Sequence, residues 1–473
     1  MTGLFPVQNA TVPYWRTQLH HLDSHRSTPE LPEKQDIVII GAGFAGAAVA
    51  HYLLKDIPEN GQKPSITIIE AREACSGATG RNGGHIRPDL FVALAARMQA
   101  QGLEAANQVA LFEVANAQAL EDLIRDEGID CDLRRVTTGD VFVDAGEAAK
   151  IKKLWDAMTK LDDGDCPTLR SVAYHGPGDG EAERVSGIKG AKVAFTYPAH
   201  VVWPYKLVMH LLEGVVKRGV NLQTRTTVNG VSETVDEEGY WTLGTARGPT
   251  KAKKVIFATN AYTAGLLPEY DDAIYAARGT ACRVVVAPDG PGPAATSIPP
   301  LGSAGLEMES PNTVDSYYGL REDGSIIVGG GKSVFIDERE EWYRNYDDST
   351  LIESTVPYFD GWAKRTFTGW EGKTETESIW TGIMGYSADD APHVGHVPSK
   401  PGQYICAGFN GHGMPNVLLC AKGLAEMIKD GRPFSETGMP PVYETRAARL
   451  RKISDLVAAP TTGRARADIY LKF

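Results

Sequence analysis

The sequence predicts a mixed α/β (α+β) fold, in which a Rossmann-like nucleotide-binding domain is interleaved along the chain with an antiparallel-sheet domain. Three observations predict it. An apolar run at 36–40 enters the glycine-rich segment 41–46, and a second apolar run ends at Glu70. Apolar runs at 254–257 and 404–407 have the length of buried strands and end in polar or glycine-rich turns. Alternating segments, split by turn signals, lie between these runs and are typical of antiparallel strands.

The turn after 36–40 has the spacing of a dinucleotide-binding fingerprint. Gly41 permits a tight turn, Gly43 lets the backbone approach a pyrophosphate, and Gly46 allows the following helix to pack closely on the strand. The N-terminus of that helix presents unpaired N–H groups to phosphate. Glu70, which closes the next strand, is placed to bind ribose hydroxyls. Because a carboxylate there disfavours a 2′-phosphate, the motif favours FAD or NAD over NADP.

Hydrophobic spacing predicts the remaining elements. Apolar residues recur at helical spacing between Ala105 and Ile124, which predicts a helix there. Further helices are expected at 150–161, 204–218 and 415–428, and further strands at 139–143, 221–243, 317–331 and 375–385. The proline- and glycine-rich stretch from Pro288 to Pro311 predicts a long loop.

These segments predict two discontinuous domains. The nucleotide-binding domain is expected at 34–105, 197–275 and 376–435, and the antiparallel-sheet domain at 106–196 and 276–375. Residues 1–33 are expected to form an extension over the surface, and 436–473 a solvated C-terminal extension.

Composition excludes several classes of protein. The chain has 473 residues and a net charge of −12 with no long basic run, which argues against nucleic acid as a partner. Six scattered cysteines show no metal-ligand spacing, so we expect free thiols, a reducing compartment and no metal. No stretch reaches the roughly 18 apolar residues of a membrane span, and Met1 to Ser27 lacks a signal-peptide core. A cytoplasmic protein is therefore expected, while the oligomeric state stays open.

Six motifs in order carry a resemblance to a known family. They lie at 76–85 (Ser-Gly-Ala-Thr-Gly-Arg-Asn-Gly-Gly-His), 258–263, 277–280, 317–331, 386–395 and 408–414. Together with the fingerprint they resemble the D-amino-acid oxidase-like (DAO) family of FAD-dependent amine and amino-acid oxidoreductases, over about 35–435. The Gly-Arg-Asn-Gly-Gly run is most similar to the gamma-glutamylputrescine oxidase and glycine oxidase-like branch.

The resemblance implies an FAD site built from several segments. The residues it assigns to the cofactor are Gly41, Gly43, Phe44, Ala45, Gly46, Glu70, Ala71, Arg72, Ser76, Thr79, Gly80, Arg81, Asn82, Gly83, Gly84, Val228, Ala258, Thr259, Asn260, Gly382, Gly411, His412, Gly413 and Met414. Arg81 and Asn82 are expected to supply hydrogen-bond donors. The helix after 411–414 is expected to direct its N-terminus at the pyrimidine end of the flavin, where reduction gathers negative charge.

Two departures from relatives imply noncovalent FAD. Sarcosine-oxidase-like members attach flavin through a cysteine at the position of Gly382. Dimethylglycine-dehydrogenase-like members use a histidine where this chain has Arg81.

The implied reaction moves hydride from a carbon next to nitrogen to flavin N5, giving an imine, and molecular oxygen then forms hydrogen peroxide. The substrate is a small amine or amino acid. Arg321 is expected to bind a substrate carboxylate through two parallel donors, although a surface role in a hairpin is an equal alternative. One of Tyr317 and Tyr318 is expected to face the pocket, with Tyr318 assigned to the site. His85 and His412 are expected near the ring, where they bond to it or assist proton transfer.

The motifs are also compatible with other flavin-dependent reactions. Relatives with the same architecture oxidise C–OH groups, so a 2-hydroxy-acid dehydrogenase passing electrons to a quinone is the main alternative. A flavin monooxygenase is less favoured because no second complete glycine fingerprint is present. A non-catalytic flavoprotein is disfavoured because every segment of the flavin site is there.

Overall fold

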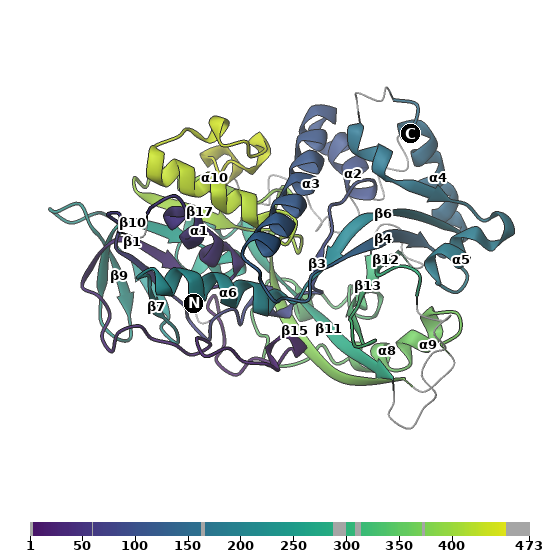
Figure 1. The fold of residues 1–473 in the computed structure, drawn as a ribbon, viewed down its shortest axis with the longest axis horizontal. Coiled ribbons are helices and arrows are strands. Elements are labelled where there is room, and N and C mark those ends of the chain that lie inside the picture. The colour runs from purple at the N-terminus through teal and green to yellow at the C-terminus, as the bar shows by residue number, and fades with distance from the viewer. Residues whose placement is uncertain are drawn as a thin grey trace.

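The computed structural model describes residues 3–58, 60–161, 166–286, 299–307, 314–370 and 374–450. Two sheets lie side by side, each with its own helices (Figure 1). The mixed α/β class and the Rossmann-like half predicted from the sequence are confirmed. Among the helices of these ranges, none combines the length and apolarity that a bilayer crossing requires.

The first sheet has a parallel centre. Its strand order is β16-β17-β10-β1-β2-β7, with the hairpin of β8 and β9 joined to β10. The strands are β1 (Lys34–Ile40), β2 (Ile66–Ile69), β7 (Asn221–Gln223), β8 (Val228–Val231), β9 (Trp241–Thr245), β10 (Thr250–Phe257), β16 (His393–His396) and β17 (Gln403–Ala407). The carboxyl ends of β1, β2, β10 and β17 meet at one edge, where ligands of open α/β sheets bind.

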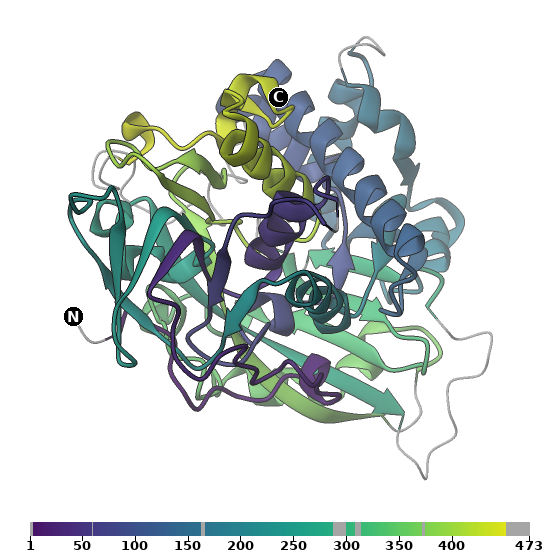
Figure 2. The same ribbon diagram turned by 60° about the vertical axis from the view of Figure 1, so that its left-hand side comes forward.

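Helices cover one face of this sheet. They are α1 (Phe44–Leu54), α6 (Pro204–Lys217) and α10 (Val417–Asp430), which lie in a row in Figure 2. Side chains along β1 alternate between the two faces: Ile37 and Ile39 pack among the helices, whereas Val38 and Ile40 pack on the face of the β8–β9 hairpin. Both faces of β1 are therefore buried, as its continuous apolar run requires.

The second sheet is almost entirely antiparallel. Its order is β15-β11-β14-β13-β12-β4-β6-β3, with β5 on β6, and only β12 and β4 pair in parallel. The strands are β3 (His85–Ile86), β4 (Arg134–Phe142), β5 (Ala173–His175), β6 (Val193–Val201), β11 (Ile274–Val286), β12 (Ser303–Glu307), β13 (Val314–Leu320), β14 (Ile326–Gly330) and β15 (Thr374–Ser387). Its helices are α2 (Val92–Gln101), α4 (Ala145–Met158), α5 (Glu181–Ser186), α7 (Arg339–Trp342), α8 (Thr355–Phe359) and α9 (Trp362–Thr366).

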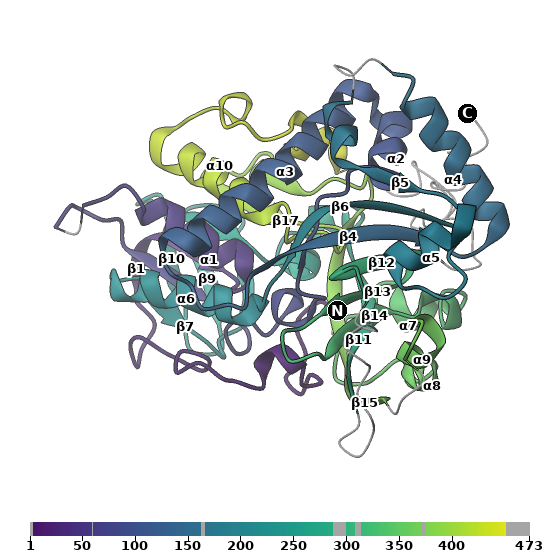
Figure 3. The ribbon, with the colours of Figure 1, turned by 45° about the vertical axis from the view of Figure 1, so that its right-hand side comes forward.

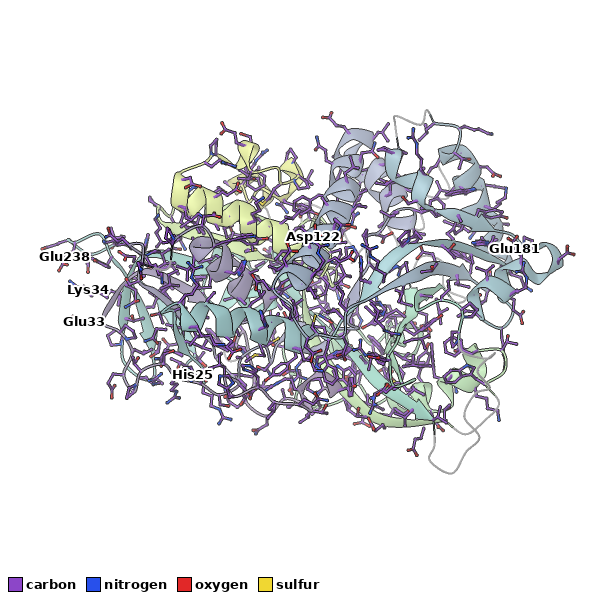
Figure 4. All side chains as sticks on the ribbon, viewed as in Figure 1. His25, Glu33, Lys34, Asp122, Glu181 and Glu238 are labelled. Atoms are coloured by element: carbon purple, nitrogen blue, oxygen red, sulfur yellow. The ribbon has the colours of Figure 1, made fainter. Side chains whose placement is uncertain are left out.

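The helix α3 (Leu103–Asp126) links the two halves. It runs from the α10 side to the α2 side of the molecule (Figure 3). Ala106 and Ala110 near its start belong to the core under α2, while Leu120 and Ile124 near its end belong to the core of the first sheet. Charged side chains such as Lys34, Glu238 and Glu181 lie instead at the outer ends of the molecule (Figure 4).

Sheet membership differs from the predicted segment limits at two strands. β6 and β15 lie in the second sheet, so residues 197–201 and 376–387 do not join the nucleotide-binding sheet. The apolar and polar residues of β6 and β15 alternate in a pattern compatible with either sheet. Only their pairing with remote strands places them in the second sheet. The predicted loop from Pro288 to Pro311 contains β12, while its parts at 288–298 and 308–311 lie outside the described residues.

The two terminal segments are tied to the fold by buried side chains. The Trp15 side chain is fully buried, and its indole N–H donates to the Asn82 carbonyl at 2.6 Å. At the other end Tyr443 is buried, and Arg449 forms an ion pair with Asp389 at 2.7 Å. Residues 3–33 are mostly exposed or half-buried between such anchors, whereas the expectation of a solvated extension fails for 436–450; residues 451–473 lie outside the described residues.

Candidate functional site

A cavity of ≈ 800 Å³ lies where the carboxyl edge of the first sheet meets the second sheet. Most of the predicted cofactor residues line it. Four of them, Gly46, Ser76, Gly80 and Gly84, do not line the wall. The three glycines allow close backbone packing behind it, and the Ser76 carbonyl accepts from Arg72 and Arg81.

The β1–α1 turn forms one end of the cavity. Gly41 has φ +111°, and a Cβ on it would lie 2.5 Å from the Ala258 carbonyl oxygen. A Cβ on Gly46 would lie 1.9 Å from the Gly41 carbonyl oxygen, so α1 can approach β1 only with glycine there. Gly43, Phe44 and Ala45 line the cavity at the start of α1. Its partial positive charge and unpaired N–H groups suit a pyrophosphate.

Glu70 is held at the end of β2 by two backbone groups. Its carboxylate accepts hydrogen bonds from the Ala42 N–H at 2.9 Å and the Arg72 N–H at 3.0 Å. Glu70 and Ala71 both line the cavity. The carboxylate is therefore preoriented at the position where a ribose is expected.

The second glycine-rich segment wraps a buried ion-pair centre. Arg72 donates to Asp348 at 2.9 Å, and Arg81 lies 3.4 Å from the same carboxylate. Arg81 also donates to the Ser76 carbonyl at 2.8 Å and the Thr381 carbonyl at 2.7 Å. Burial lowers the pKa of Arg81 to about 10, against the opposing effect of Asp348. Most N–H donors of Arg81 are thus bonded to the protein, and its main role is to hold the segment 76–84 in place.

Glycines in this segment leave room for aromatic rings. A Cβ on Gly83 would lie 2.5 Å from Tyr317 Cε2, and one on Gly84 would lie 2.8 Å from the Trp15 ring. The Asn82 side chain accepts the Gly84 N–H at 2.8 Å, which closes the turn. The Asn82 side chain therefore stabilises the turn, and the residue also lines the cavity.

Two further turns close the cavity. The Asn260 side-chain oxygen accepts the Gly408 N–H at 3.0 Å and the Phe409 N–H at 3.3 Å, which ties the end of β10 to the end of β17. The other residues predicted here also line the cavity: Val228, Ala258, Thr259, Gly382, Gly411, His412, Gly413 and Met414. A Cβ on Gly382 would lie 3.3 Å from Arg81 Cβ, a tight contact on that side.

Arg321, expected to bind a carboxylate, does not line the cavity. Its guanidinium lies over the ring of Trp15 at 5.0 Å and forms an ion pair with Asp132 at 3.0 Å. It also donates to the Val202 carbonyl at 3.2 Å. Arg321 anchors the N-terminal segment through this contact with Trp15. It follows the end of β13, and its side chain does not reach the cavity.

Tyr318 does not line the cavity either, whereas its neighbour Tyr317 does. The two side chains point to opposite faces of β13, as the two-residue repeat of a strand dictates. Tyr318 packs against Phe367 at 4.9 Å between ring centres, and its hydroxyl donates to the Leu301 carbonyl at 3.3 Å. The expectation that one of the pair faces the pocket is met by Tyr317 instead.

The two predicted histidines differ in environment. Burial, helped by the charges of Arg87 and Arg321, lowers the pKa of His85 to about 3, so this ring stays neutral. Its Nε2 is buried, and a Cβ on Gly319 would lie 2.5 Å from that atom. His412 lines the cavity, and its Nε2 lies 3.1 Å from a Glu113 carboxylate oxygen.

Sequence reasoning missed several polar residues of the wall. Arg87 lines the cavity, and its guanidinium bonds Asp140 and the Tyr197 hydroxyl. Arg278 lines it as well and donates to the Thr350 carbonyl at 2.7 Å. Arg87 lies two residues after His85, directly beyond β3, so continuing the two-residue alternation would have placed both on one face. Arg278 lies in the 277–280 motif, but its partner Thr350 is remote in sequence, so the motif alone does not place its side chain at the cavity.

Comparisons with known proteins agree with this geometry. The model of the DAO family, described as FAD dependent oxidoreductase, matches residues 36–427. Among curated proteins, none matches the chain.

Solved structures share the fold at low sequence identity. Glycine oxidase from Geobacillus kaustophilus is 17% identical, with a TM-score of 0.64, covering 85% of this chain and 96% of that one. L-Amino acid deaminase from Proteus myxofaciens, in complex with anthranilate, is 16% identical, with a TM-score of 0.66 and coverages of 94% and 98%. L-alpha-Glycerophosphate oxidase from Mycoplasma pneumoniae, with FAD bound, is 14% identical, with a TM-score of 0.58 and coverages of 84% and 95%.

Proposed function

Because the chain belongs to the DAO family of FAD-dependent oxidoreductases, we propose that it is an oxidase of an amine or amino acid. In this proposal hydride leaves the carbon next to nitrogen, an imine forms, and oxygen is reduced to hydrogen peroxide. The observation that carries the proposal is a single cavity that joins a dinucleotide cradle to a chamber with aromatic walls.

The residues of the cradle fit FAD. Gly41, Gly43 and the start of α1 suit the pyrophosphate, and Glu70 suits the adenosine ribose. The segments 79–83, 258–260 and 411–414 surround the remaining length of the cavity, where the flavin end would lie. FAD, when bound there, supplies the hydride acceptor, and the protein supplies position, charge and exclusion of water.

Among the aromatic side chains that line the cavity, Tyr317, Phe335, Trp342 and Tyr386 come from strands of the second sheet and the segments beside it. Such walls suit the apolar part of a small substrate and can also hold a cationic nitrogen over a ring face. Arg87 takes over from Arg321 as the candidate for binding a substrate carboxylate, since its side chain reaches the cavity. Its pairing with Asp140 neutralises part of its charge, so a carboxylate would share the guanidinium.

The proposal is tested by a panel of amines, N-methyl amines and amino acids, read by peroxide release in air and by flavin bleaching under nitrogen. Oxidation of an amine with stoichiometric peroxide is expected. If an amine bleaches the flavin but no peroxide forms in air, the protein is a dehydrogenase rather than an oxidase.

The 2-hydroxy-acid dehydrogenase stays as the second candidate. It is supported by the glycerophosphate oxidase that shares the fold, since its named substrate carries a C–OH group rather than an amine. Bleaching by 2-hydroxy acids, with electrons passing to a quinone and none from amines, would favour it.

A further inference from the structure

A fully buried carboxylate contacts the cavity wall from α3. Glu113 lies 3.1 Å from His412 Nε2 and 3.0 Å from an Arg97 guanidinium nitrogen, and it accepts the Asp89 N–H at 2.8 Å. Its side chain is completely inaccessible to solvent. A buried glutamate is costly unless it is paired, so these three partners explain how it is tolerated.

Glu113 remains ionised in this setting. Burial raises its pKa, but Arg97 and His412 outweigh burial, and the pKa lies below that of an ordinary glutamate. A carboxylate in this form accepts a hydrogen bond from the Nε2–H of His412. Nδ1 is then the ring nitrogen with a lone pair that can serve a ligand.

The position of the His412 ring is fixed from several sides. Asn116, one helical turn after Glu113, donates to the Met414 carbonyl at 3.2 Å and accepts the Leu419 N–H at 2.9 Å. Asn416 donates to the His412 carbonyl at 3.0 Å. The turn that carries His412 is thus bound to α3, and Glu113 bonds its ring from the same helix.

Two histidines line the cavity among the described residues, His85 and His412. The pKa of about 3 keeps His85 neutral. Beside His412, a side cavity of ≈ 30 Å³ is lined by Arg97, Asp390 and Tyr443, and it has room for a water molecule. The charged and titratable groups around the ring are therefore Glu113, Arg97, Asp390 and Tyr443.

We propose that His412 is the base that removes the proton from a substrate ammonium, with Glu113 as its positioning residue. This rests on the proposed oxidation of an amine. The N–H bond of the ammonium breaks, its electron pair stays on nitrogen, and a new N–H bond forms at His412 Nδ1. Nothing is oxidised in this step. The neutral amine that results is the form from which hydride can leave, and Glu113 stabilises the imidazolium.

The test measures the rate of anaerobic flavin bleaching against pH for amines of different acidity. In the wild type the rate rises through a limb set by the enzyme, at the same pH for every amine. In His412→Gln the limb moves to the pKa of each amine, because only amine that is already neutral can react. The loss is about 100-fold two pH units below that pKa and vanishes above it.

Glu113→Gln keeps the hydrogen bond but removes the charge. The limb then stays at one pH for every amine, while the bleaching rate above it falls, because the imidazolium formed by the proton transfer has lost its carboxylate partner. His21→Gln, at a side chain that is 65% exposed, is the matched control and leaves the profile unchanged. FAD content and thermal unfolding confirm that each variant is folded and loaded.

Binding of tert-butylamine gives a readout without turnover, since its carbon next to nitrogen has no hydrogen to lose. Flavin absorbance reports the binding, which requires higher pH in His412→Gln than in the wild type. If His412→Gln lowers the bleaching rate equally at every pH and for every amine, His412 is a structural residue and not the base. If only 2-hydroxy acids bleach the wild-type flavin, the amine oxidation itself is wrong and this proposal falls with it.

Discussion

The ring of Tyr317 occupies the space where a Cβ atom at position 329 would lie, so only glycine fits there. A Cβ on Gly329 would lie 2.0 Å from Tyr317 Cζ and 2.1 Å from its hydroxyl oxygen. A Cβ on Gly83, in the second glycine-rich segment, would also lie 2.5 Å from Tyr317 Cε2. The place of the ring on the cavity wall therefore depends on two missing methyl groups.

Gly329→Ala is expected to push Tyr317 out of place, at a cost of about 1–3 kcal/mol from overpacking. Flavin bleaching should slow while FAD is retained. Gly214→Ala is the control, because nothing lies within 4 Å of a Cβ there in α6, and it should be neutral or slightly stabilising. Urea unfolding and bleaching kinetics measure both effects, and an unchanged bleaching rate in Gly329→Ala would contradict the role of the ring.

Asp348→Asn should loosen the cofactor segment, since Asp348 is the carboxylate that Arg72 and Arg81 share. Removing one partner of a buried ion pair costs about 3–5 kcal/mol. The variant is expected to unfold at lower urea and to lose FAD on dialysis. Asp126→Asn, in an exposed pair with Arg125, should change stability by less than about 1 kcal/mol.

Arg321→Ala should lower stability and affect carboxylated and uncarboxylated substrates equally, because its guanidinium binds Asp132 outside the cavity. Arg87→Lys should instead change the preference between them, since a lysine cannot reproduce the planar fork of donors. Relative kcat/KM for paired substrates measures this. A selective effect in Arg321→Ala would restore the role predicted from the sequence.

Stability should fall as the pH is lowered from about 6.5 towards 3, because of His85. Its pKa drops from 6.5 in the unfolded chain to about 3 in the fold, so only the unfolded state takes up a proton in this window. Between pH 7 and 5 the expected loss from this group is about 2 kcal/mol. His85→Gln should flatten this part of the profile in urea titrations, and an unchanged slope would show that other groups dominate.

FAD is expected to be noncovalent, since Gly382 has no side chain for attachment and Arg81 is committed to backbone carbonyls and Asp348. Acid precipitation should release the yellow colour into the supernatant. Colour that stays in the pellet would require a link to another residue.

Much of the nucleotide half could be predicted from the sequence, because its signals are local. The turn at 41–46 and Glu70 belong to one contiguous strand–helix–strand unit, and each glycine answers a steric need within it. Free thiols were also predictable, and Cys75, Cys131, Cys282, Cys406 and Cys420 are free and buried in the fold.

The substrate side was less predictable, because its groups are brought together from remote positions. Arg72 meets Asp348 across 276 residues, and His412 meets Glu113 across 299. Arg321 and Tyr318 carry suitable chemistry, yet Tyr318 points to the other face of β13, and Arg321, just beyond the strand, pairs with Asp132 instead.

By itself the sequence determined the family, the dinucleotide cradle and the helices and strands that build it, because short-range spacing encodes them. Only the tertiary structure decided which arginine, tyrosine and histidine face the cavity, because those choices follow from strand register and long-range ion pairing. Burial then keeps His85 without a proton, and the charges of Arg97 and His412 keep Glu113 ionised.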